Sequence, residues 1–162
     1  MRVLGIDPGY AIVGYGVVDY NSNKFKTVCY GVVRTNQDMP FQKRLQQIYK
    51  AVIHIIEKTK PDAISIEQLF YTTNQKTVIY VAEARGVILL AAQEKEIPIY
   101  EYTPLQVKQG VTGYGKAEKK QIQEMIKTLL KLDKIPKPDD AADALAVAIC
   151  HGHSAKSKIL NR

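Results

Sequence analysis

The chain has 162 residues, of which 46% are hydrophobic and 24% are charged, so it is long enough for one domain with a sizeable core and too short for two. It shows neither an apolar run of the roughly 18 residues that a membrane-spanning helix needs nor the charged and apolar regions of a signal peptide, so we expect a cytoplasmic protein. Its two cysteines lack metal-ligand spacing and lie in apolar stretches, which predicts reduced core thiols, and the net charge of +7 favours a polyanionic partner such as nucleic acid.

The N-terminal part of the chain has the pattern of strands. Residues 3–7 form a short apolar stretch that ends at Asp7. Residues 13–20 and 24–35 are rich in β-branched and aromatic residues, and the polar turn Asn21-Ser22-Asn23 separates them. This pattern predicts a β-hairpin beside the first strand.

A helix and a second buried strand follow. Apolar residues recur at helical spacing from Phe41 to Lys60, and Pro61 predicts the end of that helix. Residues 63–67, with the sequence Ala-Ile-Ser-Ile-Glu, then form an apolar strand. Like the first strand, this one ends in a carboxylate, Glu67.

The next predicted helix, from Gln75 to Glu94, is unusually apolar. Its later half, residues 87–92, is apolar around most of its circumference, which packing on one face of a sheet does not require. We therefore expect a second apolar neighbour, such as a twin subunit. A central helix within one subunit is the alternative.

A strand and three helices are predicted for the last third. The strand spans 97–102, and Thr103-Pro104-Leu105-Gln106 has the residues of a capping box with proline at the first helical position. Further helices are expected from Ala117 to Leu132 and from near Asp139 to about Cys150.

The C-terminal tail differs from the rest of the chain. Residues 154–162 are polar, and we expect them to be frayed. The order of the other elements predicts a single α/β domain over residues 1–153, with a mixed sheet covered by helices on both faces.

Two acidic residues occupy the last positions of apolar strands. If the strands of Asp7 and Glu67 are parallel neighbours, both carboxylates lie at the edge of the sheet where α/β proteins bind ligands. Two anions side by side repel each other unless a cation or a proton neutralises them. Taken singly, Asp7 could equally be a loop-starting aspartate and Glu67 a salt-bridged glutamate.

Two further acids belong to the closing helix. Asp140 and Asp143 are three residues apart and therefore share one face of it. Aspartates at helix N-termini often act as caps, but Asp139, which directly follows Pro138, is the better capping candidate. Asp143 is then left on a face of alanine, leucine and valine, where a carboxylate needs a partner, and a divalent metal ion is the simplest one.

The four acids favour a hard cation, Mg²⁺ or Mn²⁺, over zinc, because no histidine or cysteine accompanies them at ligand spacing. One or two such ions could activate a water and stabilise the departing 3′-oxygen in phosphodiester hydrolysis. His54 lies inside the first helix, and His151 and His153 do not share a helical face, so we do not expect them to be ligands.

Seven short motifs resemble, in order, those of one protein family. They are Gly5-Ile6-Asp7-Pro8-Gly9, Gly14-Tyr15-Gly16, Ile66-Glu67-Gln68, Ala84-Arg85-Gly86, Gln106-Val107-Lys108-Gln109, Ala117-Glu118-Lys119 and Asp140-Ala141-Ala142-Asp143-Ala144-Leu145. Together they make nearly the whole chain, to about His153, similar to the RuvC family of Holliday junction resolvases, the crossover junction endodeoxyribonucleases.

The resemblance has several implications. It implies a ribonuclease H-like fold with a five-stranded mixed sheet, and a homodimer. It also implies Mg²⁺-dependent, paired and symmetric incisions across a four-way DNA junction that leave 5′-phosphates, in recombination and repair. The branch-migration proteins RuvA and RuvB are the implied partners.

The resemblance also carries over the roles of single residues. The family's metal-binding acids correspond to Asp7, Glu67, Asp140 and Asp143. Phe70 matches an aromatic residue that stacks on an unpaired base near the crossover, and a core phenylalanine is the alternative. The basic residues close to the scissile phosphate correspond to Lys108 and Lys119.

Two other basic positions are open. Lys116 stands where many relatives have a small polar residue, so it either strengthens a phosphate contact or has no role. Arg85 could face DNA or pair with an acid. The short tail leaves open whatever the family does with a longer C-terminus.

Parts of the sequence are also compatible with three other functions. The segments around Asp7 and Gly14-Tyr15-Gly16 resemble the phosphate-binding hairpin of actin-like and sugar-kinase folds, but those proteins need two such domains. A junction-binding module without catalysis would not need four intact carboxylates. The third rival is a related nuclease that cuts RNA precursors.

Overall fold

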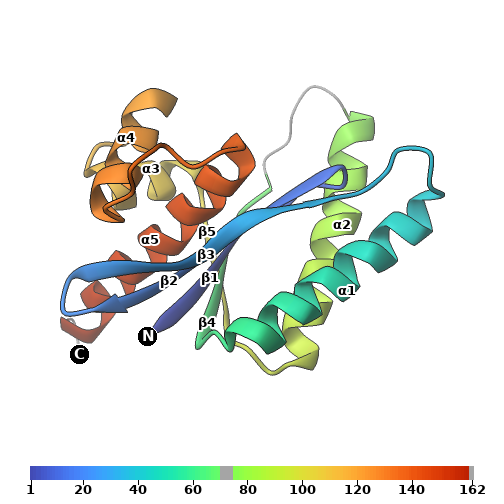
Figure 1. The fold of residues 1–162 in the computed structure, drawn as a ribbon, viewed down its shortest axis with the longest axis horizontal. Helices are drawn as coiled ribbons and strands as arrows, with labels where there is room; N and C mark the ends of the chain where they lie inside the picture. Colours follow the sequence, from blue (N-terminus) through green and yellow to red (C-terminus); the bar gives the residue numbers. More distant parts are fainter. Residues whose placement is uncertain (70–74, 161–162) are drawn as a thin grey trace.

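The structure, a computed structural model that describes residues 1–69 and 75–160, is built around a five-stranded mixed sheet (Figure 1). The strands are β1 (Arg2–Asp7), β2 (Ile12–Asn21), β3 (Lys24–Arg34), β4 (Ala63–Glu67) and β5 (Ile99–Tyr102). They lie in the order β3-β2-β1-β4-β5, with β1 antiparallel to β2 and parallel to β4, and with β4 parallel to β5. The expected hairpin is present, and its turn residues Ser22 and Asn23 have the positive φ values of 47° and 65° that tight hairpins use.

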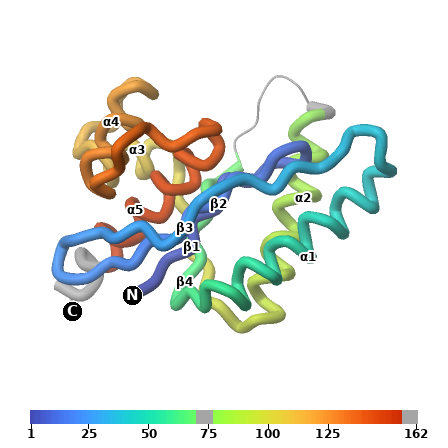
Figure 2. The backbone as a smooth tube through the Cα atoms, viewed as in Figure 1, coloured from blue at the N-terminus to red at the C-terminus, as the bar shows by residue number. Residues whose placement is uncertain are grey.

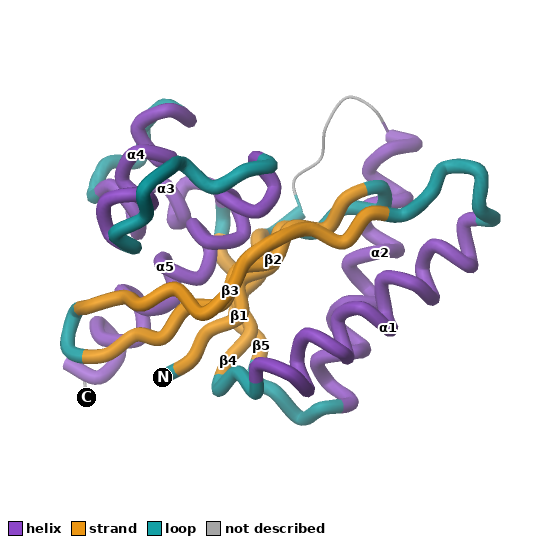
Figure 3. The backbone as a smooth tube through the Cα atoms, viewed as in Figure 1, coloured by secondary structure: helices purple, strands orange, loops and turns teal. Residues whose placement is uncertain are grey.

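Helices cover both faces of the sheet. They are α1 (Phe41–Thr59), α2 (Gln75–Glu94), α3 (Pro104–Thr112), α4 (Lys119–Leu129) and α5 (Asp139–Leu160). The pair α1 and α2 runs side by side on one face, while α5 lies against the other face and carries α3 and α4 beyond it (Figures 2 and 3). The α/β class with helices on both faces is therefore confirmed.

Two apolar clusters form the core, one on each face of the sheet. Leu4 and Ile6 of β1 belong to the cluster under α1 and α2, whereas Val3 belongs to the cluster under α5. Because side chains alternate along a strand, Gly5 and Asp7 face α5 like Val3. The same alternation in β4 turns Glu67 toward α5. The sheet therefore presents both strand-end acids to one helix.

Several element ends differ from the sequence prediction; for example, β5 begins at Ile99 rather than at residue 97, and α4 ends at Leu129 rather than at Leu132. The fourth helix begins at Lys119 rather than Ala117, because Glu118 adopts an extended conformation and caps it. Asp139 is the first residue of α5, so it lies inside the helix rather than at the capping position. The same helix continues past Cys150, its predicted end, to Leu160.

The remaining expectations concern the cysteines and membrane insertion. Both cysteines are free thiols; Cys150 is buried, and Cys29 is half-buried against the core. Burial raises the pKa of the Cys150 thiol to about 11. Within residues 1–69 and 75–160, no helix combines the length and apolar character needed to cross a bilayer.

Candidate active site

Asp7 and Glu67 are neighbours at the carboxyl ends of β1 and β4. The parallel register pairs Ile6 with Ile66, and each acid is the next residue of its strand. The expectation that the two strands are parallel neighbours is confirmed. The two carboxylates therefore stand at the same edge of the sheet and on the face that α5 covers.

Glycines allow α5 to lie directly on the strands beside these acids. A Cβ atom at Gly14 would lie 2.0 Å from the backbone oxygen of Asp140, and one at Gly5 would lie 2.1 Å from that of Ala144. Any side chain at either position would push the helix away. The glycines of β1 and β2 thus set the distance of the first turns of α5, which carry Asp140 and Asp143, from the strand-end acids.

The acids perturb one another strongly. Burial, followed by the charges of Asp143, Glu67 and Asp140, raises the pKa of Asp7 from 3.8 to about 8. The pKa of Glu67 is also raised, first by burial and then by Asp143, and burial raises the pKa of Asp143. Asp7 therefore lies within electrostatic reach of the three other acids, and its carboxyl group is pushed toward the protonated form.

The donors and the charge of this cluster fit a hard divalent cation, but the side chains do not form a closed cage. In the part of the chain that the structure describes, no three acidic, histidine or cysteine side chains stand close enough to hold one ion as they are. Asp143 is engaged by Lys119, with Oδ2 at 3.4 Å from Nζ. A bound cation would take over the charge-balancing role of the Lys119 ammonium at Asp143 and of the proton that Asp7 retains.

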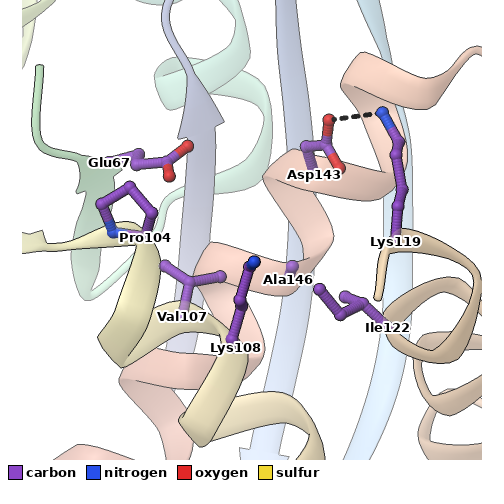
Figure 4. Close-up of a pocket in the computed structure, with 8 residues that line it drawn as sticks. All are labelled: Glu67, Pro104, Val107, Lys108, Lys119, Ile122, Asp143 and Ala146. Atoms are coloured by element: carbon purple, nitrogen blue, oxygen red, sulfur yellow. Dashed lines mark hydrogen bonds and ion pairs between the residues drawn. The ribbon is translucent and has the colours of Figure 1, made fainter. Parts of the chain in front are cut away.

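A cavity of about 220 Å³ opens beside the acids. Glu67 and Asp143 line it together with Lys108 of α3 and Lys119 of α4, while Pro104, Val107, Ile122 and Ala146 supply apolar walls. Figure 4 shows Lys119 extending to Asp143, with Lys108 below them and Glu67 on the opposite side. The two predicted lysines thus border the same cavity as two of the predicted acids.

The capping box of α3 helps to place Lys108. The Thr103 hydroxyl accepts a hydrogen bond from the backbone N–H of Gln106 at 3.1 Å, and the Gln106 side chain accepts one from the backbone N–H of Thr103 at 2.8 Å. These bonds fix the first turn of α3 directly after β5. Lys108 then lies one turn further on, at the cavity.

The other predicted DNA contacts lie elsewhere. The guanidinium of Arg85 pairs with Glu101 of β5 at 2.8 Å, so of its two alternatives the structure shows the acid pair. Lys116 is exposed in the segment before α4 and does not line the cavity. Phe70 lies outside the described residues.

The histidines have structural partners. The buried ring of His151 shares a 2.7 Å hydrogen bond with the hydroxyl of Tyr102, and Nδ1 of His153 lies 2.7 Å from the backbone oxygen of Gly110. Both are about two or more helical turns beyond Asp143 along α5. His54 is exposed on α1.

Two residues of the site were not identified from the sequence. Asp139 was interpreted as a helix cap, yet its carboxylate contacts Lys119, Lys137 and Gln123. Gln123 is a buried polar residue of α4. In the sequence, Gln123 lies between Ile122 and Ile126 on the packed side of that helix. This position could have indicated a hydrogen-bond partner, because a buried amide needs one.

Comparisons with known proteins agree with this architecture. The family model described as crossover junction endodeoxyribonuclease RuvC matches residues 3–151. A protein of that name from Fusobacterium nucleatum is 58% identical over 159 residues, covering 98% of this chain and 84% of the relative. Another from Alkaliphilus metalliredigens is 58% identical over 154 residues, covering 95% of this chain and 94% of the relative.

Two solved structures have folds similar to that of this chain. Thermus thermophilus RuvC in complex with a Holliday junction substrate has a TM-score of 0.90 and 32% identity, covering 97% of this chain and 96% of that one. The yeast mitochondrial Holliday junction resolvase Ydc2 has a TM-score of 0.69 at 18% identity, covering 97% of this chain and 80% of that one, and it shows likeness of fold alone.

Proposed function

Because the chain belongs to the RuvC family of crossover junction endodeoxyribonucleases, we propose that it resolves four-way DNA junctions by paired, symmetric phosphodiester hydrolysis. The cuts would depend on a divalent metal ion, leave 5′-phosphates and serve recombination and repair. The relative from Thermus thermophilus was solved with a Holliday junction, which supports this substrate.

The observation that carries the proposal is the uncompensated negative charge around Asp7. A carboxyl group whose pKa is raised to about 8 by burial and by three neighbouring acids is poorly suited to a purely structural role. The ionised form of Asp7 becomes favourable once a multivalent cation is bound. The lysines beside it provide the complementary surface for a phosphate.

Asp7, Glu67, Asp140 and Asp143 would hold one or two Mg²⁺ ions, for which Mn²⁺ would substitute. When bound, the metal supplies activation of the attacking water and stabilisation of the leaving 3′-oxygen. The protein's part is to keep the acids together at one edge of the sheet. The seating of α5 on Gly5 and Gly14 serves that purpose.

Lys108 and Lys119, which line the same cavity, would hold the scissile phosphate, and their positive charge would stabilise the charge that develops during cleavage. Phe70 follows Glu67 by three residues, and we propose that it stacks on an unpaired base at the crossover. Lys116 would add a phosphate contact outside the cavity.

Paired cuts require two sites, and we propose that two copies of the chain supply them. Helix α2 supports this proposal, because Ile79 and Leu90 on it are 57% and 55% exposed although they are large apolar residues. A symmetric dimer that covers them would place one acidic site on each strand to be cut. RuvA and RuvB are proposed as branch-migration partners from family membership alone.

We also propose that the protein works in the cytoplasm. The two free cysteines support a reducing compartment.

The test uses end-labelled four-way DNA, duplex DNA of the same sequence and a structured RNA, each with and without Mg²⁺. We expect symmetric nicks with 5′-phosphates in four-way DNA only, and only with the metal. Binding of the junction without cleavage under any metal condition would favour the non-catalytic binding module. Cleavage of the RNA in preference to the junction would favour the RNA nuclease.

A further inference from the structure

Lys119 lies between two carboxylates of α5. Its Nζ is 3.1 Å from Oδ2 of Asp139 and 3.4 Å from Oδ2 of Asp143. Lys119 is the first residue of α4, and its side chain is 56% exposed, so packing does little to hold the side chain in place. The two carboxylates therefore define where the ammonium stands.

These two carboxylates differ in what else they can bind. Asp143 lines the cavity with Glu67 and is one of the four acids assigned to the metal. A carboxylate oxygen that coordinates a cation offers less charge to an ammonium, and the two cations repel each other. Metal binding at Asp143 therefore weakens its contact with Lys119.

Asp139 is held in place independently of the metal. Its Oδ1 accepts hydrogen bonds from Nζ of Lys137 at 2.7 Å and from Nε2 of Gln123 at 3.2 Å. Gln123 is a buried residue of α4, so its hydrogen bond to Asp139 also joins α4 to the start of α5. With Oδ1 occupied in this way, Oδ2 remains directed at Lys119.

We propose that Asp139 is a positioning residue for Lys119. It retains the ammonium at the rim of the cavity while Asp143 exchanges the lysine for the metal, so that Lys119 meets the scissile phosphate from a fixed place. This inference rests on the proposed function, because it assigns Lys119 its target. The role of Asp139 is to hold a side chain, and it touches neither the metal nor the DNA.

A purely structural role for Asp139 makes a different prediction. If Asp139 only secured the segment before α5 through Lys137, removal of either partner would have the same effect. If Asp139 acts through Lys119, Lys137→Ala leaves Oδ2 directed at Lys119 and the cleavage rate within about twofold of wild type. The matched variant Asp139→Asn removes the charge but keeps the size of the side chain.

The first measurement is the single-turnover rate of cleavage of a preformed junction complex. We expect Asp139→Asn to slow it about three- to fivefold, the upper part of the range of an exposed ion pair, with junction affinity changed less than twofold. Asp139→Glu should recover part of the loss. In a Lys119→Ala background, Asp139→Asn should have no additional effect, because the residue through which it acts is gone.

The second measurement does not depend on cleavage. Because Asp143 also contacts Lys119 in the metal-free protein, this measurement uses an Asp143→Asn background. In that background the NMR signal of the Lys119 ammonium should show restricted motion with Asp139 intact and in Lys137→Ala, and free motion once Asp139→Asn is added. The proposal is overturned by an unchanged rate in Asp139→Asn, by an equal loss in Lys137→Ala, or by the same loss with Lys119 already removed. Absence of junction cleavage by the wild-type protein would instead refute the proposed function, and the NMR result would still stand.

Discussion

Asp7→Asn should stabilise the metal-free protein at high pH. The ionised form of Asp7 is disfavoured in the folded state, so this group does not change the free energy of unfolding below pH 3.8. As the pH rises above that value, ionisation lowers the free energy of unfolding, and the full loss is reached above about pH 8. Asparagine has nearly the same shape and no charge. In the absence of metal, the variant should therefore have a higher free energy of unfolding than the wild-type protein.

The size of the effect follows from the pKa. A tenfold change in proton affinity corresponds to about 1.4 kcal/mol, so moving the pKa from 3.8 to about 8 corresponds to about 6 kcal/mol at most. Asp7 is partly open to water, which screens its neighbours, and we expect about half of that value, about 3 kcal/mol, at pH 9. At pH 4 the two proteins should differ by less than about 0.5 kcal/mol.

The assay is urea unfolding at one protein concentration in EDTA, at pH 4, 6, 7.5 and 9, with Asp38→Asn as the control. Asp38 is exposed in the segment before α1, away from the acidic cluster, so this variant controls for the loss of one surface charge. Saturating Mg²⁺ should reverse the order of stability, because only the wild type keeps all four acids. A difference between Asp7→Asn and wild type that stays constant with pH would refute the electrostatic argument.

Three further predictions concern DNA and the seating of α5. Asp7→Asn should keep junction affinity within about threefold and lose cleavage, because docking depends on lysines and cleavage on the metal; equal loss in a binding assay and a cleavage assay would contradict that division. Phe70→Ala should slow cleavage at least about fivefold and leave the dimer intact in analytical ultracentrifugation, whereas an unchanged rate would remove Phe70 from the mechanism. Gly14→Ala should destabilise the protein by about 1–3 kcal/mol and slow cleavage, because the new methyl group would meet the backbone of Asp140; an unfolding midpoint equal to that of the wild type would show that α5 is not seated in this way.

The sheet and its acids were predictable because the sequence patterns that specify them are local. An apolar strand that ends in Asp7 and another that ends in Glu67 are visible in the sequence, and the preference of α/β sheets for ligands at strand ends supplied the rest. Spacing along one helix was enough to place Asp140 and Asp143 on one face. The hairpin was equally local, because turn residues separated two β-rich stretches.

The contacts of Lys119 were not predictable, because they depend on how α4 lies against α5. Asp139 has the sequence context of a cap, and only the tertiary arrangement turns its carboxylate toward Lys119, Lys137 and Gln123. The end of α5 was also misplaced. Its later residues are polar, but His151 and His153 bond to Tyr102 and Gly110 and so extend the packed part of the helix beyond Cys150.

The close contact of α5 with Gly5 and Gly14 affects the acids of the site and Lys119 differently. Asp140 is carried on backbone that touches the backbone of β2, so it cannot drift relative to Asp7 without lifting a whole helix off the sheet. Lys119, in contrast, reaches the same centre on a long side chain from a separate helix. The position of the acids therefore depends on backbone packing, whereas the position of the Lys119 ammonium depends on the two carboxylates that contact it.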